Sequence, residues 1–397
     1  MLIGLNSKIL SFLLLFVLFF PSKYLYFYYF VIISTLSGLT VFNKNSLKRS
    51  FSLNIFLTIF LGVIVSALLP VIYFGSSLMK NFTEILRFIP VILLLLNFAK
   101  ININYNYLFC IISLYTIINF LISFSQFNSP GLVGFITNLY SSNLHIENSL
   151  NISSRALGLS SGPGSNGSIS ALLSIFFLVT YFFHNNYKKL SIFFYILSFA
   201  NILLSQSQTS FVAIILVSLS IVVYFFFKNI KSYEITRLIP FLFIMIGAIL
   251  GVVNIYIDKL RYLLSLFEVG LSRSSYTARE DKVAFVMDLI MQNPFFLIFG
   301  HGKDFVPFSN AMDNEYVFII SVYGCFTLSI FIIWYLYSLL FIFVYKNIYA
   351  YLVTFTLAGG LIIAWPTSFI LDSRLMFIFS LYLVLCLNLA YKKEINV

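Results

Sequence analysis

The chain is built from long apolar runs that are separated by short polar breaks. The runs are continuously apolar and do not alternate at every second residue, as the strands of a membrane β-barrel would. Each has close to the ~20 residues that a helix needs to cross a hydrocarbon core of roughly 30 Å. The pattern therefore predicts an all-α integral membrane protein with about twelve (roughly 10–13) transmembrane helices. The predicted spans are 6–20, 24–42, 53–75, 82–99, 107–125, 163–183, 190–204, 207–227, 238–257, 316–344, 348–370 and 375–391.

The first apolar run has some features of a secretory signal peptide, because Lys8 precedes an apolar core. It has no A-x-A cleavage site, and a second apolar run follows at once. We therefore interpret it as the first membrane helix.

Composition supports a membrane protein and argues against a nucleic-acid partner. The 397 residues are 60% hydrophobic and only 9% charged, whereas soluble domains carry about 25% charged residues. Most of the surface must therefore face lipid, and residues 1–397 are interpreted as a single polytopic membrane domain. The net charge is +11, but no basic patch with interleaved aromatic residues is present. Lys and Arg instead follow the ends of the apolar runs.

These basic residues indicate how the helices are oriented in the membrane. With the N-terminus in the cytoplasm, most Lys and Arg residues of the short loops fall on the cytoplasmic side. Both termini are then predicted to be cytoplasmic. Short outer loops keep only Lys23, Lys80 and Arg374. The inner set is Lys44, Lys48, Arg49, Lys100, Lys188, Lys189, Lys228, Lys231, Arg237, Lys346, Lys392 and Lys393.

Two longer polar segments are predicted on the outer face, where functional residues on loops are expected. The first outer loop covers 126–162, and a large external or periplasmic loop near the C-terminus covers 258–315. The large loop holds most of the acidic residues of a chain that has only 13. They are Asp258, Glu268, Glu280, Asp281, Asp288, Asp304, Asp313 and Glu315.

The first outer loop ends in a glycine-rich stretch that follows a single cation, Arg155. Gly158 and Gly162 let a backbone approach a ligand closely, and a helix that starts at Pro163 would present free N–H groups. An Arg beside such a helix start can bind an anion such as phosphate. The alternative is a flexible loop that enters a membrane span, with Arg155 merely solvated.

The large outer loop contains an amphipathic helix, predicted from Ala278 to Met291 by the helical spacing of its apolar residues. Arg279 and Glu280 fall in its first turn, and Asn293 with Pro294 ends it. Arg273 and Arg279 are candidate ligand cations. The alternative is that they pair with the acidic residues Glu280 and Asp281.

Two further stretches of this loop carry candidate chemistry. His301 lies between Gly300 and Gly302, which predict a tight turn, and the imidazole is either structural or catalytic. Asp313 and Glu315 stand directly before an apolar run. We expect both carboxylates at the outer membrane boundary, hydrated and charged.

Smaller features have two readings each. Glu84 and Arg87 are three residues apart and can pair on one helix face; an ionisable pair within a span is a functional candidate, unless it is shallow enough to be hydrated. Asp372 and Arg374 are interpreted as a topology anchor. The hydroxyl and amide side chains of the turn "SQSQTS" (205–210) could bind sugar hydroxyls or could equally well form hydrogen bonds with backbone groups.

No cofactor or metal is expected, because the sequence has no Walker loop and no metal-ligand spacing. A Ser–His–Asp arrangement is also not evident. Cys110, Cys325 and Cys386 all fall within apolar runs and are interpreted as packing residues, not as disulfide partners.

Taken in order, three short stretches resemble the motifs of the O-antigen polymerase and O-antigen ligase superfamily of bacterial envelope polysaccharide assembly. The first is similar to R-x-x-G-x-x-x-x-P. The second is an Arg that opens an amphipathic helix ending in a proline, followed by G-x-G. The third resembles H-N-x-Y-Φ (Φ apolar) with a glycine after six further residues. The matching residues are Arg155, Gly158 and Pro163; Arg279, Pro294, Gly300 and Gly302; and Asn314, Tyr316, Val317 and Gly324.

The resemblance implies a glycosyltransferase that uses undecaprenyl-diphosphate-linked glycans as donor and acceptor, without a metal or cofactor. Asp313 occupies the motif position where the ligases have a histidine implicated as the base. This difference favours an O-antigen polymerase, which joins lipid-linked repeat units for lipopolysaccharide or capsule. An O-antigen ligase is one alternative. A lipid-linked oligosaccharide flippase is another, although such a transporter would place more charge within its spans.

The resemblance also implies roles for individual residues. Arg155 and Arg279 would stabilise the diphosphate, Asp313 is the first candidate for the base, and His301 is the second. Partners would include the lipid bilayer, with a chain-length regulator and a flippase as further candidates. Substrate contacts are expected from Arg155, Arg273, Arg279, Glu280, Asn314 and Tyr316.

Overall fold

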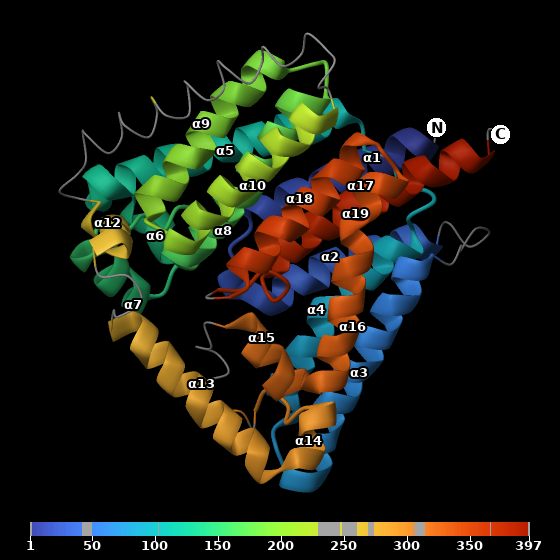
Figure 1. Ribbon diagram of the computed structural model, residues 1–397, viewed down its shortest axis with the longest axis vertical. Coiled ribbons are helices and arrows are strands. Elements are labelled where there is room, and N and C mark those ends of the chain that lie inside the picture. Colours follow the sequence, from blue (N-terminus) through green and yellow to red (C-terminus); the bar gives the residue numbers. More distant parts are fainter. Residues whose placement is uncertain are drawn as a thin grey trace.

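A computed structural model shows a helical protein, and none of the residues it describes lies in a β-strand (Figure 1). The structure describes residues 2–41, 50–101, 103–228, 247, 260–268, 274–304, 306, 314–365 and 367–395. All predicted spans except one coincide with helices. The exception, 238–257, lies outside the described residues apart from residue 247.

The apolar runs form helices because a helix satisfies its own backbone hydrogen bonds within a single apolar segment. Seven of the described helices are long and apolar enough to cross a membrane, and three further apolar helices are shorter. The long elements are α1 (Leu2–Phe19), α2 (Leu25–Val41), α3 (Phe51–Phe74), α4 (Leu78–Leu96), α5 (Tyr105–Asn128), α8 (Pro163–Phe183), α9 (Lys188–Ser205), α10 (Gln208–Lys228), α16 (Gly324–Leu339), α18 (Ile348–Ile363) and α19 (Ser373–Ile395). The count of twelve and the orientation of the termini stay predictions.

Two predicted spans differ in detail from the observed helices. The segment predicted as one helix over 316–344 is divided into α15 (Glu315–Phe318), a π-helical turn η8 (Ile319–Tyr323), α16 and α17 (Phe341–Val344). The span predicted to reach residue 370 ends at Ile363, and residues 364–372 form a loop between α18 and α19. In the sequence Pro366 follows Trp365, and proline disfavours helix at the residue before it. We call this segment the α18–α19 loop.

The two loops that were predicted to be on the outer face contain more helix than their sequences predicted. Within 126–162 the structure has η3 (Pro130–Val133), α6 (Gly134–Tyr140), α7 (Asn143–His145) and the π-helical turn η4 (Ile146–Ile152). A further short turn, η1 (Ser22–Tyr24), connects α1 to α2. The large loop has α12 (Arg261–Glu268), α13 (Ser274–Gln292) and α14 (Pro294–Phe299). Most of these elements are too short to show a helical period in the sequence.

The helix α13, which was predicted to be amphipathic, begins earlier than predicted. It starts at Ser274, so Arg279 lies in its second turn and not in its first. It ends at Gln292, before Asn293 and Pro294 as predicted. Among the residues of α13 whose burial is described, Val286 and Ile290 are buried and lie on one face, four positions apart. Met287 and Met291 of the predicted apolar face are exposed, so the amphipathic pattern is confirmed only in part.

The helices form two packed groups that share a central set. α5, α8, α9 and α10 pack together on one side, and α3, α4, α14 and α16 on the other. α18 and α19 lie between them and contact both (Figure 1). α8 is the most buried of the long helices, with 94% of its membrane-length window inside the protein. The beginning of α1 and the end of α19 lie toward one corner of Figure 1, and α13 runs along the opposite edge.

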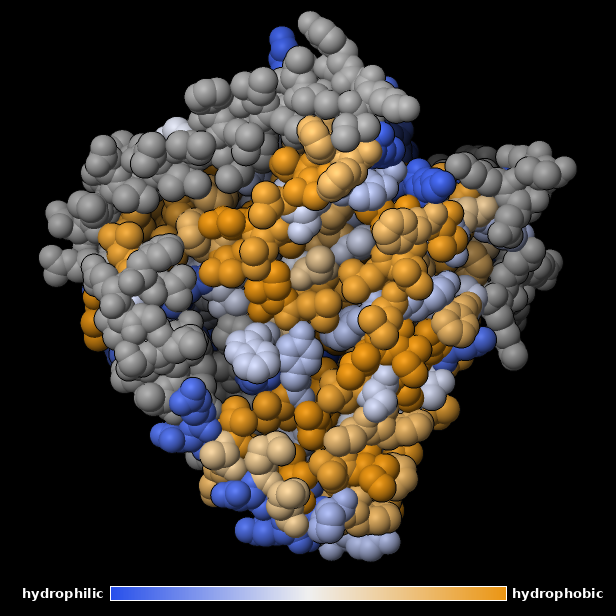
Figure 2. Space-filling model, viewed as in Figure 1, coloured by the Kyte–Doolittle hydropathy of each residue, from blue (hydrophilic) through white to orange (hydrophobic). Residues whose placement is uncertain are grey.

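The surface is strongly apolar, as the composition predicted. Large apolar side chains stay exposed along the outer faces of several helices (Figure 2). Exposed apolar area on this scale is unusual for a monomeric soluble protein and suits contact with lipid. The three cysteines are free. Examples of the exposed residues are Leu61 and Ile72 on α3, Leu219 and Phe227 on α10, and Ile333 and Leu336 on α16.

Candidate active site

Buried amide side chains hold the loop of the first motif in place. Gln126 Oε1 on α5 accepts hydrogen bonds from the N–H groups of Leu157 (2.9 Å) and Gly158 (2.8 Å). Asn119 Oδ1, also on α5, accepts from the N–H of Leu159 (2.8 Å). Because these amides are buried and directed at the backbone, the loop has a defined conformation. The alternative of a flexible entry into a membrane span is therefore wrong.

Gly158 has a geometry that only glycine suits. Its φ is +57°, in the left-handed region. A Cβ at this position would lie 2.4 Å from Asn119 Oδ1 and 2.5 Å from Asn166 Oδ1. Asn166 in turn accepts a hydrogen bond from Asn119 Nδ2 (2.9 Å). The absent side chain thus makes room for the amide network that supports the loop.

Arg155 is partly buried and its orientation is fixed by its neighbours. Its Nε donates to the carbonyl of Ser205 at the end of α9 (3.3 Å). The guanidinium lies 4.0 Å from the ring centroid of Tyr262 on α12, which is a cation–π contact. Arg155 is therefore not merely solvated, and its contacts join the first outer loop to the large one.

The turn "SQSQTS" uses its side chains on backbone groups. Gln206 Oε1 accepts from the N–H of Leu263 (3.2 Å), and Gln206 Nε2 donates to the carbonyl of Ser154 (3.2 Å). Gln208 Nε2 donates to the carbonyl of Tyr262 (2.7 Å). The structure thus supports the interpretation that this turn satisfies backbone groups, and it places the turn between Arg155 and α12.

The backbone beside Arg155 is strained. Ser154 and Gln206 have positive φ values of +50° and +49°, which non-glycine residues seldom adopt. Such residues cost of order 1–3 kcal/mol each and cluster at functional sites. Their position around Arg155 indicates that the surrounding contacts hold this cation in a conformation the chain would not adopt alone.

The second and third motifs meet at their glycines. Gly300 and Gly302 have φ values of +86° and +73°, as a tight turn requires. The N–H of His301 donates to the carbonyl of Ser321 (2.8 Å), and the N–H of Gly302 donates to that of Val322 (3.2 Å). These bonds join the G-x-G turn to η8, the π-helical turn of the third motif.

We call this contact between the G-x-G turn and η8 the glycine crossing. Gly324, the last residue of the third motif, is also part of it. Its φ is +85°, and a Cβ there would lie 2.2 Å from the carbonyl oxygen of Ile298. At Gly300, a Cβ would lie 2.2 Å from the carbonyl oxygen of Val322. Each glycine thus lets the opposite backbone approach closely, and this contact coincides with the break between η8 and α16.

His301 is buried within this crossing. Its exposed fraction is 0%, and its ring centroid lies 5.4 Å from that of Phe296 on α14. Burial lowers the pKa of this histidine below its ordinary value, because the charged form loses hydration. This burial favours a structural role for His301.

Glu84 and Arg87 form the predicted pair on α4, and a third charge joins them. Arg87 Nη1 and Lys303 Nζ lie 2.5 Å and 2.7 Å from the Glu84 carboxylate. The hydroxyl of Tyr323 in η8 also donates to Glu84. The Glu84 side chain is only 2% exposed, so the pair is buried and not hydrated. Breaking a buried pair of this kind costs about 3–5 kcal/mol.

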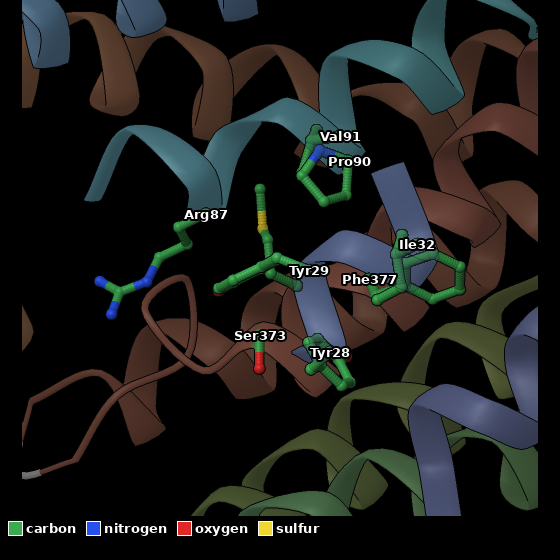
Figure 3. Close-up of a pocket in the computed structure, with 9 residues that line it drawn as sticks. Tyr28, Tyr29, Ile32, Arg87, Pro90, Val91, Ser373 and Phe377 are labelled. Carbon is green, nitrogen blue, oxygen red and sulfur yellow. The ribbon is translucent and has the colours of Figure 1, made fainter. Parts of the chain in front are cut away.

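This charged cluster ties the G-x-G turn to α4. Asn81 Oδ1 accepts the N–H of Lys303 (2.8 Å), directly after Gly302. A small cavity with room for about one water molecule lies beside Arg87 (Figure 3). Arg87 comes from α4, Tyr29 from α2 and Ser373 from the start of α19, so three helices converge there.

Glu315 is not hydrated at a membrane boundary, contrary to prediction. It is 1% exposed, and its carboxylate accepts the N–H groups of Phe369 (3.0 Å) and Leu371 (2.6 Å) in the α18–α19 loop. The carboxylate compensates for its lost hydration through these charge-assisted hydrogen bonds. Asp313 lies outside the described residues, so its expected hydration stays a prediction.

Asn314 and Tyr316 have structural contacts in the third motif. Asn314 Oδ1 caps α15 by accepting the N–H groups of Tyr316 (3.1 Å) and Val317 (3.2 Å). The hydroxyl of Tyr316 donates to the carbonyl of Leu361 on α18 (2.8 Å). Only the amide nitrogen of Asn314 then stays available for the predicted substrate contact.

The α18–α19 loop joins the third motif to the first. Glu315 holds its backbone from one side, as described above. From the other side, Asp372 Oδ2 accepts the hydroxyl of Ser165 in the first turn of α8 (3.0 Å). Arg374 Nη1 donates to the carbonyl of Leu159 (2.6 Å), within the first motif. Through this loop and the glycine crossing, all three motifs belong to one connected structure.

Asp372 and Arg374 have separate roles in this connection. Asp372 Oδ1 caps α19 by accepting the N–H of Arg374 (2.9 Å). The Arg374 side chain is 2% exposed and also donates to the carbonyl of Phe20 at the end of α1 (2.7 Å). Arg374 thus anchors the first motif to α1, which is a larger role than the predicted topology anchor.

The remaining candidates are placed in part. Arg279 lies on α13, and Glu280 beside it is exposed. Six residue steps of at most ~3.6 Å separate Ser274 from Glu268, so α13 begins within roughly 22 Å of the end of α12. Arg273 lies outside the described residues. Within the described residues, no group of three or more His, Cys, Asp or Glu side chains could hold a metal ion.

Sequence reasoning did not select several residues that shape this site. The amides Asn119, Gln126 and Asn166 support the first motif, and Lys303 completes the cluster at Glu84. His145, an exposed residue of α7, packs its ring against Gly162. The available signal was the presence of polar side chains within apolar spans, which are costly unless they have partners.

Comparison with known proteins agrees with this arrangement. A family model described as O-antigen ligase matches residues 193–332, from α9 to α16. This range contains the second and third motifs but not Arg155. A search among curated proteins finds no match. The match shows that residues 193–332 are similar to the O-antigen ligase family. The long apolar helices independently suit a multi-pass membrane protein.

Proposed function

We propose that this protein is a polysaccharide polymerase of the bacterial inner membrane. It joins oligosaccharide repeat units linked to undecaprenyl diphosphate at the outer face of that membrane, without a metal or cofactor. The observation that carries this proposal is the single connected structure formed by the three motifs. Segments around residues 155–165, 298–304 and 314–324 are linked by direct hydrogen bonds and by the α18–α19 loop.

The proposed chemistry needs mainly cations near a diphosphate. Lipid diphosphate leaves with the electron pair of the glycosidic bond, so positive charge near its oxygens stabilises the transition state. Arg155 is proposed for this role, supported by its fixed orientation on Tyr262. Arg279 on α13 is proposed as the second cation, and Arg273 and Glu280 as further contacts to the lipid-linked glycan.

An acceptor hydroxyl must also lose a proton during the reaction. General base catalysis of this step contributes about 10²–10⁴-fold. Asp313 is the first proposed base, and the capping residue Asn314 next to it would orient the acceptor through its amide nitrogen. Tyr316 would contribute to the same pocket from α15. His301 is the weaker proposal, because its ring is buried.

Ligation is a second candidate function, and one observation favours it. The matching family model is described as O-antigen ligase. A ligase would use the same donor and the same cations but would transfer finished glycan to a different acceptor. The aspartate at position 313, where the ligases have histidine, is the reason we prefer polymerisation.

The test compares Arg155→Ala and Arg279→Ala with Lys189→Ala, an exposed cation at the start of α9. In a deletion strain complemented with each variant, we expect both arginine variants to display single repeat units but no long surface glycan. Lys189→Ala should give normal chains. Protein levels are measured by immunoblot, and glycan length by gel electrophoresis.

Two outcomes would count against the proposal. Long chains in both arginine variants at normal protein levels would show that polymerisation does not need Arg155 or Arg279. Long polymer that accumulates on its lipid carrier in the deletion strain would instead identify the protein as the ligase.

A further inference from the structure

The three histidines of the chain have different surroundings. His301 is buried at the glycine crossing. His184 follows the C-terminal end of α8, where its ring stacks on Tyr105 with centroids 4.3 Å apart. His145 is exposed, and it lies at the opposite, N-terminal end of α8 beside the first motif. It is thus the one histidine of the three that is both exposed and adjacent to a motif.

His145 lies between the two ends of the first motif. Its Cε1 and Nε2 atoms are 3.5 Å from the position that a Cβ on Gly162 would occupy. Gly162 is the N-cap residue of α8 and directly precedes Pro163, the last residue of the motif. The imidazole therefore lies over the end of the motif at which the helix begins.

The other end of the motif is one helical turn away. α7 continues into η4, so Ser149 follows His145 by four residues on a continuous helical stretch. The carbonyl of Ser149 accepts the N–H of Arg155 (2.9 Å). The helical stretch that carries His145 therefore also binds the backbone of the proposed cation.

A purely structural role accounts poorly for this position. A histidine kept for packing is expected to be buried, as His301 is, or stacked on a ring, as His184 is. His145 is exposed on a short helix and contacts a glycine, which leaves the ring edge accessible to a ligand. An exposed imidazole next to an anion-binding loop suits transfer of a proton at neutral pH.

We infer that His145 is a catalytic residue that accepts the proton of the acceptor sugar hydroxyl. The inference rests on the proposed glycosyl transfer, and in it His145 takes the place of Asp313 as the group that receives the proton. The acceptor oxygen forms a bond to the anomeric carbon of the donor, and the bond from that carbon to the diphosphate oxygen breaks. The diphosphate takes the electron pair of the broken bond. The hydroxyl proton passes to a ring nitrogen of His145 and then to water.

The charged groups of η4 and of the elements that contact the first motif set the conditions for a pH experiment. Glu147 lies two residues further along in η4, and Arg155 follows in the same loop. Asp372 reaches the first turn of α8 through Ser165, and Arg374 reaches Leu159. The groups whose charge bears on the result are therefore Glu147, Arg155, Asp372 and Arg374.

The kinetic test uses His145→Gln, which keeps a polar side chain but accepts no proton, with His184→Gln as the matched control. Purified protein in nanodiscs is given lipid-linked repeat units extracted from a deletion strain. We expect kcat of His145→Gln to fall by about 10²–10⁴-fold with little change in KM. The acidic limb of the pH–rate profile should also be lost. His184→Gln should keep both.

A comparison with Asp313→Asn separates the two proposed bases. If His145 is the base, Asp313→Asn keeps the acidic limb. If only Asp313→Asn removes the acidic limb, the carboxylate is the base and the inference about His145 fails. Wild-type kcat in His145→Gln would also overturn it. If the wild-type protein makes no glycan product from lipid-linked donors, the proposed function is wrong, and the inference about His145 is wrong as well.

A labelling experiment gives a readout that does not depend on turnover. In the His184→Gln protein, His145 is the remaining exposed histidine, because His301 is buried. Diethyl pyrocarbonate should modify His145, as measured by mass spectrometry of its peptide. Lipid-linked repeat units should slow this modification at least tenfold, whereas undecaprenyl phosphate without sugar should protect less. Equal labelling with and without lipid-linked repeat units would contradict a position at the acceptor.

Discussion

Gly158 shows how a single residue can determine the conformation of the cation's loop. Its positive φ and the two amide oxygens within 2.5 Å of its would-be Cβ leave no room for a side chain. The amides of Asn119 and Asn166 then reach the loop backbone and each other. The proposed orientation of Arg155 therefore depends on a residue three positions away that carries no functional group.

We expect Gly158→Ala to destabilise the protein by about 1–3 kcal/mol, because alanine is strained at this φ and its Cβ collides with Asn119. Activity should fall together with stability. Thermal unfolding in detergent measures the effect. Gly131→Ala is the control, since no atom lies within 4 Å of a Cβ at that position. Equal unfolding temperatures for the two variants would show that the loop adapts.

His301 makes a prediction about pH. Burial lowers its pKa, so the unfolded chain binds a proton more readily than the folded protein. The stability contributed by the neutral imidazole is complete above the ordinary value of about 6.5. It is lost as the pH falls through the lowered pKa of the folded state.

The wild-type protein should therefore lose stability below about pH 6.5, by at most ~1.4 kcal/mol per pH unit from this group. His301→Gln should be less stable at neutral pH but show a shallower decline between pH 7 and 5. Unfolding temperatures at several pH values test this. Parallel declines in both proteins would mean that other groups dominate the acid response.

At the scale of the element, the third motif contains a short helix whose start depends on one cap. Asn314 Oδ1 accepts two N–H groups of α15, and the helix then passes through η8 to the break at Gly324. The π-helical turn aligns Ser321 and Val322 with the G-x-G turn. In a regular helix the carbonyls of Ser321 and Val322 would be bonded within the helix and could not both accept the N–H groups of His301 and Gly302. The segment is therefore divided and does not form one long helix.

We expect Asn314→Ala to cost about 0.5–2 kcal/mol through the lost cap. Asn314→Asp should keep wild-type stability, because a carboxylate oxygen caps equally well. If the amide nitrogen contacts the acceptor as proposed, Asn314→Asp should nevertheless raise KM for the lipid-linked acceptor. Unfolding temperature and KM are measured on the same preparations. Wild-type KM in Asn314→Asp would restrict Asn314 to its role as a cap.

At the scale of the whole molecule, the α18–α19 loop connects segments that are far apart in the chain. Its backbone donates a hydrogen bond to Glu315 in the stretch of the third motif, and its Asp372 accepts one from Ser165, just after the first motif. Arg374, which follows the loop, donates to the carbonyl of Leu159 within the first motif. The two helix groups that carry these motifs pack on α18 and α19. A loop in this position can keep the cations and the acceptor site in a constant relation within a membrane.

Sidedness is the main prediction at this scale. In a protein without its three native cysteines, Asn151→Cys in the first outer loop should react with a membrane-impermeant maleimide on intact spheroplasts. Asn186→Cys, between α8 and α9, should react only after permeabilisation. Both positions are exposed, so access decides the result. The reverse labelling pattern would invert the predicted topology and place the motifs in the cytoplasm.

The sequence by itself determined the helices and several of their ends. Apolar runs of membrane length form helices wherever they occur, because their backbone groups find partners within the run. Pro163, Pro294 and the glycines at 300 and 302 also act locally, through φ and missing N–H groups or side chains. The motif order could be recognised for the same reason, since it depends only on residue types and their spacing.

Only the tertiary structure decided which polar groups are buried and what they contact. Glu315 appeared to be a boundary charge in the sequence, but backbone N–H groups more than fifty positions away enclose it. His301 and His145 are both single histidines beside glycines, yet one is buried and the other is exposed. Burial depends on segments that are distant in the chain, so local patterns do not contain it.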